Sequence, residues 1–355
     1  MKAISALWSD KAFTTSKLTW TLLVTVLLLT LLVLQLGAVQ VQASDFLALL
    51  GWDSDTTISA AGQSRLYVLQ HIRLPRVLFS LCIGAALGLS GALTQALFRN
   101  PLADPGLFGV SAGAACTVAL SIVFLSQFDL HLAPPLRIFF FPALAFIGAL
   151  ATCVLLDRIA QWLTPGSVSG LLLTGIAINA LASAVIGLST FLANDEQLRT
   201  LSTWMLGSLS SANWMNLGLI VGLLVVALWQ LRTLPGALNA LALGESAARH
   251  VGIDVHRIRI RVFILVALCT GFAVAWCGIV GFVGLVAPHL VRLSIGADQR
   301  SLLPLSMLMG ALLLLLADSL ARTLAIPAEI PVGIFTALLG APFFLLLLRL
   351  ARSKL

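Results

Sequence analysis

Long apolar runs, separated by short polar or charged segments, make up most of this chain. Ten such runs, each about 17–25 residues long, predict ten membrane-spanning helices. The predicted helices cover residues 18–38, 74–98, 107–126, 138–160, 168–191, 214–233, 259–278, 279–295, 302–318 and 330–350. Only Cys277 and Gly278 divide the seventh run from the eighth, so this boundary is the least defined. The pattern predicts an all-α, polytopic membrane protein whose residues 1–355 form a single domain.

The composition supports a membrane protein. Charged residues are 10% of the chain and hydrophobic residues 59%, whereas soluble domains carry about a quarter charged residues. The basic residues stand singly at the ends of apolar runs, which is unlike the clustered basic face of a nucleic-acid-binding protein. The five cysteines all lie inside apolar runs without metal-ligand spacing, so we expect them to pack as small core residues.

The first apolar run could be a membrane span or a signal peptide. Three lysines precede it, and Val41-Gln42-Ala43 could serve as a cleavage site. The apolar core of a signal peptide is about 7–15 residues long, and this run is longer. We therefore expect a retained first span.

The distribution of basic residues predicts the topology. If the N-terminus is cytoplasmic, fifteen of the 21 lysines and arginines fall on the inside. Ten spans then place both termini in the cytoplasm. The longest inside loop runs over about residues 232–261, and the longest outside segment over about residues 39–72.

The sequence lacks the motifs of ATP binding and of familiar intramembrane enzymes. It contains no Gly-x-x-x-x-Gly-Lys-Ser/Thr, no His-Glu-x-x-His and no Gly-x-Ser-x-Gly. An ion-coupled carrier usually buries ionisable groups in mid-membrane. Here the acidic residues in and beside the spans fall at predicted span ends: Asp104, Asp157, Asp195, Glu196, Asp298, Asp318 and Glu329. His289 lies nearer a span interior. It is either a hydrogen-bonded structural histidine or a proton relay. An ion-coupled secondary transporter and an intramembrane enzyme remain the alternative functions.

The long inside loop contains a short predicted helix over residues 241–253. Glu245 lies near its positive N-terminal end, Arg249 and His250 lie near its C-terminal end, and Gly252 ends it. Such an exposed amphipathic helix either docks into a groove of a partner or lies on the lipid surface.

Small residues recur at helical spacing in several spans. The fifth span carries Gly175, Asn179, Ser183 and Gly187, and the second carries Gly84, Gly88 and Gly91. Stripes of small residues allow close helix packing. The stripe of the fifth span also has an amide and a hydroxyl group, so it is the best candidate for the wall of a transport path.

Six arginines lie on the outside, against the positive-inside bias, and three of them stand at span ends. Arg73 and Arg76 flank Pro75 before the second span, and Arg322 ends the ninth. They could anchor the protein at the membrane interface, pair locally with Asp318, or bind a partner.

Four separated blocks carry a resemblance to a known family. They are residues 73–114, 281–289 and 329–342, together with the pattern Gly-Glu-x-x-Ala-x-x-x-Gly at Gly244, Glu245, Ala248 and Gly252. In their order along the chain, these blocks resemble the permease subunits of bacterial ABC importers that carry iron-siderophores, haem or cobalamin. The resemblance covers the chain from about Arg73 to its C-terminus.

The resemblance implies an inner-membrane importer working by alternating access. It implies a homodimer, or a dimer with a close paralogue, served by two cytoplasmic ATPase subunits and a periplasmic substrate-binding protein. ATP and Mg²⁺ would be bound by the ATPase, and this chain would hold no cofactor.

The resemblance also assigns roles to residues of this sequence. It places the coupling loop at about 232–261, with Gly244, Glu245, Ala248, Arg249 and Gly252 against the ATPase. Arg73, Arg76 and Arg322 would dock the binding protein, and the fifth and tenth helices would line the path. Ser167, Val168 and Ser169 would form the cytoplasmic gate, where Val168 is less polar than the family pattern.

Overall fold

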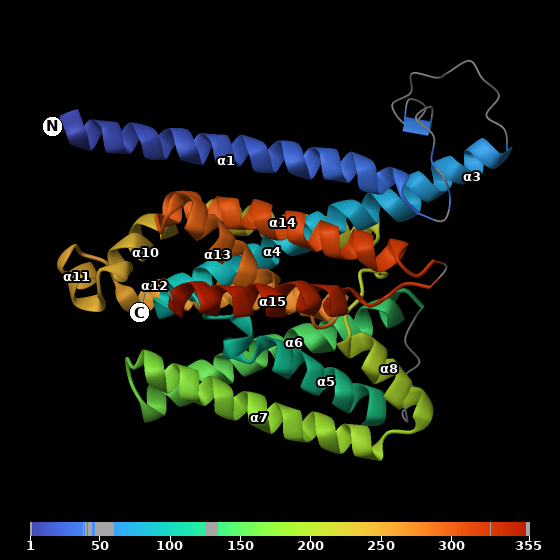
Figure 1. The fold of residues 1–355 in the computed structure, drawn as a ribbon. Coiled ribbons are helices and arrows are strands. Elements are labelled where there is room, and N and C mark those ends of the chain that lie inside the picture. The colour runs from blue at the N-terminus through green and yellow to red at the C-terminus, as the bar shows by residue number, and fades with distance from the viewer. Residues whose placement is uncertain are drawn as a thin grey trace.

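The computed structural model is a bundle of helices (Figure 1). It describes residues 2–37, 39, 41, 45–46, 60–124, 134–326 and 328–352. The long helices are α1 (Lys2–Gln35), α4 (Leu74–Phe98), α6 (Pro134–Leu163), α7 (Val168–Leu192), α12 (Val255–Cys277), α14 (Gln299–Thr323) and α15 (Val332–Arg352). Between them lie α3 (Ala60–Val68), α5 (Val110–Phe124), α8 (Asp195–Met205), α9 (Trp214–Gln230), α10 (Leu234–Ala242), α11 (Glu245–His250) and α13 (Val283–Ile295).

All ten apolar runs are helical, but their lengths are unequal. Six helices are long and apolar enough to cross a membrane, and a seventh crossing is possible if α9 and α10 are counted as one span bent by 60°. The apolar helices α5, α13 and the first part of α15 are shorter. A 13-residue helix such as α13 is about 20 Å long and does not cover a hydrocarbon core of about 30 Å by itself.

The arrangement agrees with the predicted topology. The start of α1 and the end of α15 lie at the same end of the bundle as α10 and α11 (Figure 1). Helices α3 and α8 lie at the opposite end. The basic residues therefore mark the end with α10 and α11 as the inner face and the other as the outer face.

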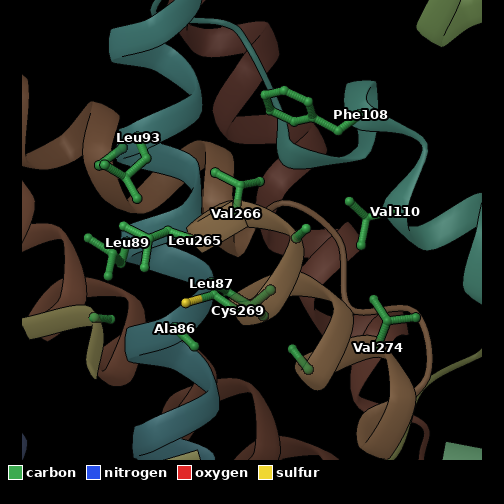
Figure 2. Packing of buried hydrophobic residues seen from close by; sticks show 14 of the residues in the cluster. Ala86, Leu87, Leu89, Leu93, Phe108, Val110, Leu265, Val266, Cys269 and Val274 are labelled. Atoms are coloured by element: carbon green, nitrogen blue, oxygen red, sulfur yellow. The ribbon is translucent and has the colours of Figure 1, made fainter. Parts of the chain in front are cut away.

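Helix α4 forms the centre of the bundle, and most of its residues are buried. In Figure 2, Ala86, Leu87, Leu89 and Leu93 of α4 pack close to the α12 residues Leu265, Val266 and Cys269. On another face, glycines bring α4 against two further helices. A Cβ atom at Gly84 would lie 2.3 Å from the Gly310 carbonyl oxygen of α14, and one at Gly91 only 1.6 Å from the Gly284 carbonyl oxygen of α13. The row of small residues on the second span, Gly84, Gly88 and Gly91, is therefore a surface for helix packing.

Several boundaries differ from the sequence prediction, and two of the differences have a clear local cause. The predicted eighth helix, 279–295, begins only at Val283, because Gly278 has φ 68° and Phe282 has φ 66°. The second span has a helical extension on the outer side, α3, joined by a π-helical turn at Leu69–Arg73. This turn lies where Pro75 has no N–H for the carbonyl four residues earlier.

Candidate functional site

Two of the outer arginines, Arg76 and Arg322, lie at the outer ends of α4 and α14 in a largely buried cluster. Arg76 donates to Asp318 Oδ1 from Nε (3.2 Å) and Nη2 (2.9 Å), and to both carboxylate oxygens of Glu329 from Nη1 (2.8 and 2.9 Å). The Asp318 side chain has no exposed surface, whereas that of Glu329 is 46% exposed. The cluster joins α4, α14 and the segment that leads into α15.

Arg322 completes this cluster without satisfying all of its donors. Its Nε lies 3.3 Å from Asp318 Oδ2, which is ion-pair distance without hydrogen-bond geometry. Its Nη2 is buried and has no acceptor among the described residues. A local pair with Asp318 was one of the sequence interpretations, and the structure contains it.

Arg73 has a different environment, in the π-helical turn before α4. Its guanidinium donates to the carbonyl oxygens of Leu34 (2.8 Å), Gln35 (3.1 Å) and Val39. It therefore binds the free carbonyl groups at the C-terminal end of α1, where a cation is favourable. No local sequence signal predicts this contact, because it joins residues more than thirty positions apart.

The inner face presents two short helices, α10 and α11. The sequence predicted one helix over 241–253, but the chain turns at Gly244, whose φ is 117°, and α11 begins at Glu245. Gly252, at φ 81°, ends α11 as predicted: its N–H donates to Arg249 O and that of Ile253 donates to Ala248 O.

One ion pair holds α11 against α12, and a second lies within α11. Glu245 Oε1 lies 3.1 Å from Arg259 Nη2 of α12, and Oε2 lies 3.4 Å from Arg249 Nη2. The Arg259 side chain is 16% exposed, whereas that of Arg249 is 69% exposed. Ala248, on the inward side of α11, is fully buried. The Glu245–Arg259 pair is therefore the link between the two helices, whereas an exposed pair such as Glu245–Arg249 contributes only about 0–1 kcal/mol.

The predicted wall of the transport path, the row of small residues on the fifth span (α7), divides into two halves. Gly175 is buried against the Leu107 carbonyl, which lies 2.2 Å from a Cβ atom built on this glycine. Asn179 Nδ2 donates to the Gly106 carbonyl oxygen at 3.2 Å. Ser183 and Gly187 are exposed on this protomer. The inner half thus holds the loop between α4 and α5, and the outer half is free for a partner, for lipid or for water.

That loop, residues 99–109, carries a short 3₁₀ helix at Pro105–Phe108. Asp104 caps it by accepting from Gly106 N at 2.7 Å. Burial raises the pKa of the Asp104 carboxyl above its ordinary value, against the opposing effect of the Gly106 amide.

The predicted gate residues lie at the inner end of α7. Ser167 is the N-cap and accepts from Gly170 N at 3.1 Å, and α7 begins at Val168. Ser167 and Ser169 are exposed. The side chain of Val168 lies outside the described part of the chain, so the chemistry of the gate stays a prediction.

Comparison with known proteins now identifies the family. The sequence matches the FecCD transport family over residues 23–350. This chain belongs to that family. It is 47% identical over 288 residues to the hemin transport system permease protein HmuU of Yersinia pestis, which covers 80% of this chain and 84% of that protein. It is 41% identical over 278 residues to the vitamin B12 import system permease protein BtuC of Vibrio cholerae, with coverage of 78% and 81%.

Solved structures agree with this assignment. An inward-facing metal-chelate type ABC transporter superposes with a TM-score of 0.78 at 31% identity, covering 94% of this chain and 99% of that one. PsaBC from Streptococcus pneumoniae shares the fold, with a TM-score of 0.54 at 19% identity. The FecCD chain is thus an inner-membrane ABC importer permease subunit, as the sequence blocks predicted.

Proposed function

We propose that this FecCD permease moves a metal chelate of the haem, cobalamin or iron-siderophore class from periplasm to cytoplasm by alternating access. It works as a homodimer with two ATPase subunits and a periplasmic binding protein. The names of the hemin and vitamin B12 permeases support the cargo class. The subunit biases a conformational equilibrium and does no covalent chemistry.

The attachment of α11 to α12 is the observation that best supports this function. A six-residue helix at the inner face is too short to be stable alone, yet two glycine turns and the Glu245–Arg259 pair fix it to α12. Force applied to α11 is therefore passed directly to a membrane-spanning helix. This is what coupling to a separate ATPase requires, and Gly244, Glu245, Ala248, Arg249 and Gly252 form the coupling element.

The acidic residues support this function over ion-coupled transport. Among the residues whose side chains the structure describes, Asp157 and Asp318 are the acids inside long spans, and each lies within the last two turns of its helix. Asp318 is fixed by two arginines. A mid-membrane carboxylate free to bind and release an ion is not present among them.

Docking of the binding protein is assigned to Arg73, Arg76 and Arg322. Their place on the outer face, against the positive-inside bias, supports this. We expect docking in nanodiscs to weaken as salt rises, since the Debye length shortens. A flat salt response, with unchanged affinity of an Arg322→Glu variant, would remove the arginines from the interface.

The cargo path is assigned to the dimer axis along α7 and α15, with Ser167, Val168 and Ser169 as the inner gate. The exposed Ser183 and Gly187 support a path beside the outer half of α7. A path wall with few binding groups releases a large chelate quickly.

Reconstitution in proteoliposomes tests the function. The permease, its ATPase and its binding protein are combined, and uptake of haem, cyanocobalamin and a ferric siderophore is measured with and without internal ATP. We expect uptake of one of these chelates only with ATP. Uptake driven by a proton or sodium gradient without the ATPase would refute the proposal.

A further inference from the structure

The outer face contains a recess that none of the assigned roles uses. It has a volume of about 450 Å³ and lies between α8, the 208–211 segment and the outer end of α12. Because α8 follows α7 after only two residues, the recess opens beside the outer end of the proposed path. Figure 1 shows α8 at this end of the bundle. A concave site of this size suits part of a small molecule better than a flat protein surface.

The floor of the recess is fixed by backbone contacts. Ser208 N donates to Cys277 O at 2.8 Å, and Ser211 Oγ donates to Trp276 O at 2.7 Å. A Cβ atom at Gly278 would lie only 2.1 Å from the Trp204 carbonyl oxygen, so the two segments touch. The recess is therefore preorganised.

The walls combine hydroxyl groups, two indole rings and one cation. The hydroxyl groups come from Thr200, Thr203, Ser208, Ser210 and Ser211, and the indoles from Trp204 and Trp276. Ser208 is half-buried and donates its hydroxyl to that of the exposed Ser210 at 3.0 Å. Such walls suit a ligand with flat apolar parts and oxygen-rich edges.

Arg199 supplies the cation at the rim. It is an outer arginine, against the positive-inside bias. Asp195 and Glu196 lie on the same helix, but no carboxylate among the described residues is within ion-pair distance of its guanidinium. Unlike the other outer arginines with described side chains, it has no acid or carbonyl partner there. A free guanidinium beside the Ser210 hydroxyl, whose proton has no acceptor among the described residues, is a carboxylate site in its chemistry.

We propose that this recess receives an ionised carboxylate of the cargo as the chelate leaves the binding protein. The inference rests on the proposed function and narrows its substrate class to chelates that carry carboxylates, such as haem. Arg199 would bind the carboxylate, the Ser210 hydroxyl would donate to one of its oxygen atoms, and the indoles would cover apolar edges. Arg199 then acts in transfer of the cargo and not in docking.

The test uses the complete importer in proteoliposomes with haem as the probe. We expect Arg199→Gln to lower haem moved per ATP hydrolysed about threefold to fivefold, the range of a partly exposed charge pair. The docking affinity of the binding protein and the ATPase rate should stay at wild-type values. Arg199→Lys, which keeps the charge, should restore most of the loss. Glu196→Gln changes an exposed charge on the same helix outside the recess lining and should change nothing.

Each other outcome decides against the inference. Unchanged haem transport per ATP in Arg199→Gln would overturn it, and weakened docking would assign Arg199 to the binding protein. ATP-driven uptake of cyanocobalamin but not of haem would overturn the carboxylate site and leave the proposed function intact. No ATP-driven uptake of any tested chelate would overturn the proposed function itself.

Discussion

Replacing Asp318 with Asn should strongly destabilise this permease. The Asp318 side chain has no exposed surface and lies within ion-pair distance of both Arg76 and Arg322. An amide of the same shape keeps one acceptor but removes the negative charge between two cations. Breaking a buried ion pair by removing one partner costs about 3–5 kcal/mol. We expect a loss of this size and a thermal midpoint several degrees lower.

Glu329→Gln is the matched control. It removes a carboxylate that binds the same arginine, but the Glu329 side chain is 46% exposed. Water replaces part of the lost interaction, so the expected cost is about 0–1 kcal/mol. The two substitutions change the same charge in the same cluster and differ in burial.

Native cysteines provide the assay. Cys153, Cys269 and Cys277 are free and buried, so a thiol-reactive fluorophore labels them as the protein unfolds in detergent. Adding Arg322→Met to Asp318→Asn should recover part of the loss, because it removes the surplus positive charge. Equal midpoints for Asp318→Asn and wild type, or equal losses for both single variants, would refute the electrostatic reasoning.

Three further predictions address coupling, the path and packing. Glu245→Arg should abolish stimulation of the ATPase, and adding Arg259→Glu should restore the mounting of α11 but not stimulation if the partner recognises the Glu245 carboxylate; full recovery would give Glu245 a purely structural role. Without the native cysteines, Ser183→Cys should react with a membrane-impermeant thiol reagent in at least one nucleotide state, and Ala182→Cys, at a position 8% exposed, much less; equal protection in every state would place the path elsewhere. Gly91→Ala should prevent folding, measured as the loss of a monodisperse peak in detergent, because its Cβ would overlap the Gly284 carbonyl; a wild-type yield would contradict that contact.

Local sequence signals predicted the helices and their order well. Apolar length and the distribution of charge depend on each segment alone, and so does the end of α11 at Gly252. The break before Val283 was missed because Phe282 adopts a positive φ that its residue type does not favour.

The partners of charged residues could not be predicted in the same way. Arg76 binds Asp318 across 242 positions, and Arg73 binds backbone carbonyl groups that carry no sequence signature. The recess beside Arg199 is built from three separate segments, so only the folded chain brings it together. The sequence did supply one sign of it, an arginine on the outer side.

The glycine contacts of α4 limit which parts of this transporter can move. At Gly84 and Gly91 the backbone of α4 lies directly on those of α14 and α13, with no flexible side chains between them to absorb a displacement. These three helices, α4, α13 and α14, are therefore expected to move together as one rigid unit. By contrast, a Cβ atom at Gly187 of α7 would meet no atom of another described element within 4 Å. The change that opens one side of the path and closes the other is therefore expected to come from helices outside this unit, such as α7, whose outer half is exposed on this protomer.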